Sequence, residues 1–199
     1  MSPSALAPPR PAEARPAPPH PAAPHRTPRH AATVPVVRAL RPADRVALGE
    51  LYAGLSPRAR FLRFASGTPR LSPRVLARMV DLDWRDTGAW GAFVGDVCVG
   101  EVRLGRLRGD RGEVAVTVAE GWRRRGLGRR LLLVAAAGAP ELGVRRLVVA
   151  VHPENRGAVA FVRDVLQVGL RDCGGLLEGE VVLDAGRPAA LREAVASRG

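Results

Sequence analysis

Residues 113–131, EVAVTVAEGWRRRGLGRRL, decide how the rest of the chain is interpreted. In the first six of these residues valine stands at every second position, which is typical of a β-strand. The segment after Gly126 has the apolar spacing of a helix. Gly126 and Gly128 stand at the junction, and five arginines lie between positions 123 and 130. Glycines at a helix start let backbone N–H groups converge on an anion, and the positive end of the helix dipole adds to the attraction. The segment therefore predicts a phosphate or pyrophosphate site.

Two common phosphate motifs do not fit this segment. The dinucleotide fingerprint needs a third glycine where this chain has Leu131, and the Walker loop needs a lysine, whereas all 31 basic residues here are arginine. What remains, Arg123-x-x-Gly126-x-Gly128, resembles the coenzyme A pyrophosphate motif of the GNAT superfamily of N-acetyltransferases. The resemblance implies that acetyl-CoA is the cosubstrate and no metal is needed. It implies coenzyme A contacts from Val116, Thr117, Val118, Arg123, Arg124, Arg125, Gly126, Leu127, Gly128, Arg129 and Asn155.

The resemblance to the GNAT superfamily extends from about Val34 to Leu183, and a closer resemblance to one branch of that superfamily is visible. Four short matches are similar to the protein-lysine acetyltransferase branch of bacterial GNAT proteins: Ser56, Arg63-Phe64, Leu71-Ser72 and Val80-Asp81-Leu82-Asp83. Enzymes of that branch are often fused to a cyclic-nucleotide-binding or an acyl-CoA-synthetase-like domain, and neither fits in this chain. The resemblance implies direct acetyl transfer to a protein lysine in a ternary complex.

Strand and helix signals alternate along the chain. Strands are expected near 33–40, 90–94, 97–104, 113–118, 145–151, 170–173 and 178–183, and helices near 42–55, after 56 and 72, at 126–138 and at 155–166. In the fold that this chain resembles, these elements form an α/β (α+β) domain. It has a mixed central sheet of about six to seven strands with helices on both faces. The parallel strands 113–118 and 145–151 would splay apart at the acetyl-CoA site. Alternation along 97–104 places Cys98 on one face with Val102 and Leu104.

The first part of the chain differs in composition from the rest. Ten of the 18 prolines lie in the first 30 residues, and no apolar periodicity accompanies them. We therefore expect a disordered Pro/Ala/Arg-rich tail over residues 1–33, followed by one acetyltransferase domain over residues 34–184. Residues 185–199 are expected to form a C-terminal tail or a short helix.

Glu113 is the candidate general base. It matches the family's strand-borne glutamate, and by alternation its side chain shares a face with Ala115 and Thr117. Glu101 on the preceding strand and His152 at a strand end are the alternatives. Many GNAT proteins also carry a tyrosine seven residues after the Asn155 position as general acid for the leaving thiolate, and this chain has Val162 there. The departing thiolate would then leave unassisted or take its proton from water.

The net charge and the cysteine content of the chain indicate which binding partners and which cellular compartment to expect. A net charge of +12 favours a polyanionic partner, but the arginines cluster in a Gly-rich turn beside only Trp122, so we expect acyl-CoA and no nucleic acid. The longest apolar run has ten residues against the roughly 20 of a membrane span, so no membrane partner is expected. Two cysteines and no apolar leader favour the cytoplasm. Two other functions stay open: acetylation of a small amine or antibiotic, and a non-catalytic coenzyme A-binding module.

Overall fold

The computed structural model describes residues 34–64 and 71–183; the expectations for residues 1–33 and 185–199 fall outside these ranges. One seven-stranded sheet runs through the described chain in the order β1-β2-β3-β4-β5-β7-β6. Its strands are β1 (Val36–Ala39), β2 (Thr87–Val94), β3 (Val97–Arg106), β4 (Arg111–Val118), β5 (Arg146–Val151), β6 (Arg171–Cys173) and β7 (Leu176–Val182). The helices are α1 (Arg45–Ala53), α2 (Pro57–Phe64), α3 (Pro73–Val80), α4 (Leu127–Gly138) and α5 (Arg156–Leu166), joined by short 3-10 turns at Pro42–Asp44, Glu120–Trp122 and Ala139–Leu142.

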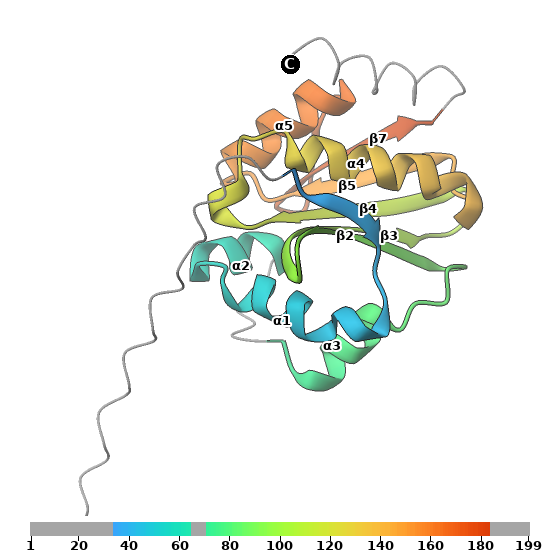
Figure 1. The fold of residues 1–199 in the computed structure, drawn as a ribbon. Coiled ribbons are helices and arrows are strands. Elements are labelled where there is room, and N and C mark those ends of the chain that lie inside the picture. The colour runs from blue at the N-terminus through green and yellow to red at the C-terminus, as the bar shows by residue number, and fades with distance from the viewer. Residues whose placement is uncertain (1–33, 65–70, 184–199) are drawn as a thin grey trace, which may run out of the picture.

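The sheet separates two helical layers (Figure 1), with α1, α2 and α3 on one face and α4 and α5 on the other. The larger core packs Leu131, Leu132 and Val162 of α4 and α5 against one sheet face. The smaller core packs Leu48 and Tyr52 of α1 against the opposite face. The expected mixed sheet with helices on both faces is therefore confirmed. None of the described helices is long and apolar enough to cross a membrane.

Turn chemistry explains where several elements begin and end. Gly95 has φ +58° in the two-residue turn that joins Val94 to Val97, so the hairpin predicted from Gly95-Asp96 is confirmed. The Ser72 hydroxyl accepts a hydrogen bond from the Val75 N–H and caps α3, as its Ser-Pro start predicts.

A β-bulge corrects one prediction about the strand faces. Cys98 pairs with Phe93 and lies in the smaller core, whereas Val102 and Leu104 lie in the larger one. Ala92 pairs with Gly100 and the next residue, Phe93, pairs with Cys98, so one residue of β3 has no partner in the register. Such an extra residue moves the side chains before it to the other face. The expectation that Cys98 shares a face with Val102 was therefore wrong, although its burial was predicted correctly.

The central strands β4 and β5 are parallel but pair over only three rows. Arg111 lies opposite Arg146, Gly112 opposite Leu147, and Glu113 opposite Val148. Beyond this last row β4 continues through Val118 and β5 through Val151 without further pairing. We call the space between residues 114–118 and 149–151 the wedge. It is the splay that the family resemblance predicts.

Candidate functional site

Backbone groups of β4 point into the wedge. The Ala119 N–H donates to the Val99 carbonyl at 3.0 Å, which fixes the alternation of hydrogen bonds between β3 and β4. By that alternation Val116 and Val118 direct their N–H groups away from β3 and toward β5. Since β5 does not pair with them there, both donors are available to a ligand in the wedge.

The wedge opens toward the loop that starts α4. Gly126 is the N-cap residue of this helix and has φ +76°, and Arg124 two residues earlier has φ +58°. No side chain of the described residues caps the helix, so the N–H groups of its first turn are free to meet an anion. A left-handed residue before an uncapped helix start is the geometry that the predicted anion-binding turn requires, and binding itself stays a prediction. We call residues 123–129 the cradle.

Side chains of the cradle take different roles. Arg123 Nε donates to the Val118 carbonyl at 3.2 Å, so this guanidinium lies at the mouth of the wedge. Arg125 lies over the Trp122 ring at 5.3 Å. Leu127 is 5% exposed and belongs to the core, so it offers a ligand only its backbone. Arg129 Nε is buried and has no hydrogen-bond partner among the described residues.

Two positions near α5 have structural explanations. Asn155 Oδ1 accepts a hydrogen bond from the Ala158 N–H at 3.2 Å and caps α5. Val162 is 5% exposed and lies in the larger core. The position where many GNAT proteins carry a tyrosine is therefore filled by packing.

Glu113 lies in the last paired row, at the narrow end of the wedge. Its side chain is exposed, and in the same row lie Gly105 of β3 and Thr87 of β2. Directly paired residues share a face, so Glu113 lies on the face that carries α1, α2 and α3. The face alternation expected for Glu113, Ala115 and Thr117 follows from the register with β3.

The alternative base Glu101 is buried on the same face of the sheet, the one that carries α1, α2 and α3. It is 1% exposed, the Tyr52 hydroxyl donates to one carboxylate oxygen, and Arg103 Nη2 contacts the other at 2.6 Å. Burial, together with the negative charge of Glu101, raises the pKa of Tyr52 well above its usual range. This phenol therefore stays protonated and keeps donating to Glu101.

Thr117 joins this buried cluster to α2. Its hydroxyl accepts from Arg63 Nε at 2.9 Å and lies 3.4 Å from the Tyr52 hydroxyl. The contacts link positions 52, 63, 101 and 117, which are far apart in the sequence. Sequence reasoning matched Arg63 to a family pattern but gave it no role. Only its place in that pattern was available as a signal.

Helix α2 lies across one side of the wedge, with contacts near the C-terminal ends of both β4 and β5. At the β4 end, Arg63 holds Thr117 and Glu120 accepts from the Ser56 N–H at 3.3 Å. Beyond the β5 end, the rings of Phe61 and His152 meet at 5.4 Å. His152 Nδ1 accepts from the Glu154 N–H at 3.3 Å, so the proton of the neutral imidazole sits on Nε2.

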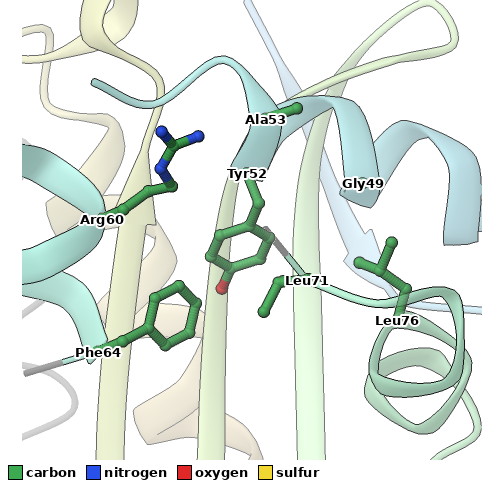
Figure 2. A pocket seen from close by; sticks show the side chains of 7 residues that line it. All are labelled: Gly49, Tyr52, Ala53, Arg60, Phe64, Leu71 and Leu76. Atoms are coloured by element: carbon green, nitrogen blue, oxygen red, sulfur yellow. The ribbon is translucent and has the colours of Figure 1, made fainter. Parts of the chain in front are cut away.

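Two hollows flank the buried cluster. A cavity of about 80 Å³ lies between α1, α2 and α3, and Figure 2 shows Tyr52 reaching into it beside Phe64 and Leu71. A larger cleft of about 450 Å³ opens between α2, α3 and the sheet. The residues that line this cleft are Arg63, Phe64, Val75, Arg78, Met79, Asp81, Leu82, Asp83, Thr87 and Arg103.

Comparisons with known proteins agree with this geometry. The model of the acetyltransferase (GNAT) family matches residues 59–165, more than half of the chain. The GNAT domain of S. lividans PAT is 26% identical, with a TM-score of 0.70 over 74% of this chain and 90% of that one. No curated protein sequence matches the chain significantly.

Two solved structures, one with bound coenzyme A and one with bound acetyl-CoA, share the fold. The PaiA N-acetyltransferase from Thermoplasma acidophilum, in complex with coenzyme A, has 17% identity and a TM-score of 0.64 over 75% of this chain and 99% of that one. A phosphinothricin acetyltransferase from Sinorhizobium meliloti, in complex with acetyl-CoA, has 16% identity and a TM-score of 0.62 over 75% of this chain and 89% of that one.

Proposed function

Because the chain belongs to the acetyltransferase (GNAT) family, we propose that it transfers the acetyl group of acetyl-CoA directly to the side-chain amine of a protein lysine. The observation that carries the proposal is the continuity of the wedge with the cradle: unpaired β4 donors lead into an uncapped helix start. Similarity to the GNAT domain of S. lividans PAT supports the protein-lysine branch.

The cradle and the wedge divide the binding of acetyl-CoA between them. The first-turn N–H groups of α4, with Arg123, Arg124, Arg125 and Arg129, would hold the pyrophosphate. The N–H groups of Val116 and Val118 would then receive the pantetheine amide and the acetyl oxygen along β4. A backbone donor at the acetyl oxygen stabilises the negative charge that develops during attack. When bound, acetyl-CoA supplies the activated thioester carbon.

Glu113 takes the proton of the acceptor amine in this proposal. A lysine ammonium has a pKa of about 10.4, so almost none of it is nucleophilic at neutral pH without a base. Glu113 removes one proton directly or through water. The amine lone pair then forms the N–C bond, the C–S bond breaks with its electron pair leaving on sulfur, and the nitrogen loses its second proton through water to the departing thiolate. Glu113 suits this role because it is exposed at the narrow end of the wedge.

The two alternative bases are less well placed. Both carboxylate oxygens of Glu101 are engaged, by Tyr52 and by Arg103, and the side chain does not reach solvent. His152 uses Nδ1 to accept a backbone hydrogen bond, which leaves Nε2 as a donor in the neutral ring. These contacts support Glu113 as the base.

The thiolate leaves without a tyrosine in this account. Val162 occupies the position where many GNAT proteins carry the tyrosine. The chain's single tyrosine, Tyr52, keeps its proton and donates it in a hydrogen bond to Glu101. A thiolate is stable enough near neutral pH to leave unassisted or to take its proton from water, since a free thiol has a pKa of about 8.5.

Both described cysteines are free thiols, which favours a cytoplasmic setting for the reaction.

A second candidate is acetylation of a small amine. The 450 Å³ cleft has the size of a small-molecule pocket, and the phosphinothricin acetyltransferase that shares the fold supports this candidate. A non-catalytic coenzyme A-binding module is the third, and the absence of a tyrosine at Val162 is its support.

One experiment separates the three candidates. Lysate proteins and a panel of small amines are incubated with labelled acetyl-CoA and the purified protein, and the products are identified by mass spectrometry. Label on lysine side chains of specific proteins supports the proposed function. Label confined to the small amines supports the second candidate, and no label on any acceptor, with coenzyme A binding intact, supports the third.

A further inference from the structure

The 450 Å³ cleft leads along the sheet face toward Glu113. Thr87 of β2 lines the cleft, and Gly105 and Glu113 follow it in the same row. A Cβ added to Gly105 would meet no atom within 4 Å, so the space above that residue is open. The cleft and Glu113 are therefore neighbours on one face, and no side chain stands at Gly105 between them.

Charges differ between the inner end and the rim of the cleft. At the inner end Arg103 is 18% exposed and is held by Glu101 at 2.6 Å and by the Met79 carbonyl at 2.7 Å, and Arg63 is half-buried beside it. At the exposed rim lie Asp81, Asp83 and Arg78. The rim carries more acid than base, whereas at the inner end Arg103 is paired with Glu101 and Arg63 supplies the net positive charge. An entering ammonium is first attracted and then meets positive charge.

Arg63 is fixed in place at this inner end. Its Nε donates to Thr117 Oγ1 at 2.9 Å, and its guanidinium lies 5.1 Å from the Phe64 ring. Thr117 is flanked by Val116 and Val118, whose N–H groups face the wedge. The Thr117 side chain therefore holds the positive charge of Arg63 next to the β4 backbone that is proposed to bind the acetyl group.

We propose that this cleft admits the acceptor amine and that the Arg63 guanidinium favours the uncharged form of the amine, which attacks the acetyl group. The inference rests on the proposed function. A fixed cation disfavours a second positive charge nearby, so it assists the loss of the ammonium proton that Glu113 accepts. Arg63 acts here as a positioning residue for charge and forms no bond with the reacting atoms.

Other charged groups surround Arg63 from each neighbouring element. Tyr52 of α1 stays protonated because burial raises its pKa. Glu101 and Arg103 of β3 pair with each other. Arg78, Asp81 and Asp83 lie at the rim, and three backbone N–H groups hold the pKa of Asp83 below its usual range. Glu113 of β4 is the proposed base, and His152 touches α2 through Phe61.

The test compares pH profiles of Arg63→Met, Arg63→Lys and the unchanged protein, each also in a His152→Gln background. Two acceptors are used: a peptide with one lysine and a blocked N-terminus, and the same peptide with its lysine acetylated and its N-terminus free. Their amines have pKa values of about 10.4 and about 7.7–8.0. Arg74→Met is the matched control because Arg74 is exposed on α3 and does not line the cleft.

For the lysine peptide at saturating concentration, Arg63→Met should lower kcat about tenfold at pH 7 and move the rise of the kcat profile up by about one pH unit, because kcat reports ionisations in the bound complex. The loss should shrink toward zero above about pH 10, should be smaller for the free N-terminus, and should be rescued by Arg63→Lys. Arg74→Met should leave both profiles unchanged. If Arg63→Met does not fold by circular dichroism, Arg63→Gln replaces it with the same expectation.

Two results would overturn the inference, in different ways. An equal loss at every pH and for both amines, with the unchanged protein active, contradicts the role of Arg63 and leaves the proposed function standing. No acetylation of either amine by the unchanged protein, with acetyl-CoA bound, contradicts the proposed function and this inference with it.

Discussion

Glu113 lies directly opposite Val148 in the last row where β4 and β5 pair, and beyond this row the two strands separate. The carboxylate therefore marks the narrow end of the wedge, while the cradle lies beyond its wide end. A chain of backbone donors at Val116 and Val118 connects the two ends. This single register relates the proposed base, the acetyl position and the anion site to one another.

Gly126→Ala is expected to weaken coenzyme A binding at least tenfold by isothermal titration calorimetry. A Cβ at this position would meet no atom within 4 Å, so crowding is not the reason. The reason is the φ of +76°, which an L-residue adopts only at a cost, so the helix start would change shape.

Gly109→Ala is the matched control, because Gly109 has φ +73° and equally open surroundings but lies in the turn between β3 and β4. It should lower stability by a similar amount with coenzyme A affinity unchanged. Equal affinities for both variants and the unchanged protein would remove the cradle from the binding site.

Tyr52→Phe is expected to lower the free energy of unfolding by about 1–3 kcal/mol in urea denaturation, because it leaves a buried Glu101 oxygen without its donor. The loss should be smaller in a Glu101→Gln background, where no charge is left unpaired. A double-mutant cycle measures the difference. Strictly additive losses would mean that the Tyr52–Glu101 contact contributes nothing to the fold.

Asp44→Asn is expected to destabilise the protein at pH 7 by about 2 kcal/mol. Arg38 contacts both carboxylate oxygens at 2.6 and 2.7 Å and holds the pKa of Asp44 below its usual range, aided by the Arg41 N–H at 2.8 Å. A lowered pKa stabilises the fold above the unfolded value of about 3.9, and this contribution is lost as the pH falls through the folded value.

Thermal melts from pH 7 to pH 2 check this prediction: the gap in Tm between Asp44→Asn and the unchanged protein should begin to narrow below about pH 3.9 and close as the pH falls through the folded value. Asp164→Asn, an exposed position on α5, serves as the control and should show no gap. A gap of constant size down to pH 2 would contradict the assignment to the Asp44 charge.

Removal of residues 1–33 is expected to leave kcat/KM for a lysine peptide within about twofold of the full chain. The composition of this segment predicts no core, and the residues of the wedge, the cradle and the cleft all lie between positions 63 and 151. A tenfold fall with a folded product would assign the segment a part in acceptor binding.

Much of the fold was predictable because its signals are local. The strand that ends at Val118, the helix start at Gly126 and the Gly95-Asp96 hairpin each follow from a few adjacent residues. Strand starts were less accurate: β2 begins at Thr87, three residues before the expected Trp90, because Gly88 and Ala89 carry little β-propensity and pair only in the context of the sheet.

The buried cluster around Glu101 was not predictable, because it joins positions that are 49 to 65 residues apart. Nothing local to Arg63 or Thr117 indicates that they meet. The face of Cys98 was mispredicted for a related reason, since the bulge in β3 shows only in its pairing with β2. Family resemblance supplied the cradle and Glu113, while the acceptor side required the tertiary structure.

The most direct test of the account is the pH dependence of kcat for Glu113→Gln with a lysine peptide and saturating acetyl-CoA. The substitution keeps the shape and removes the basicity, and Glu141→Gln, exposed in the 3-10 turn that follows α4, is the control. General-base assistance is typically worth about 10² to 10⁴ in rate, so kcat should fall at least tenfold at pH 7 with coenzyme A affinity little changed, and the loss should shrink as the pH rises and free amine accumulates. Full kcat at pH 7 in a folded Glu113→Gln protein would contradict the account and leave the wedge without its proposed base.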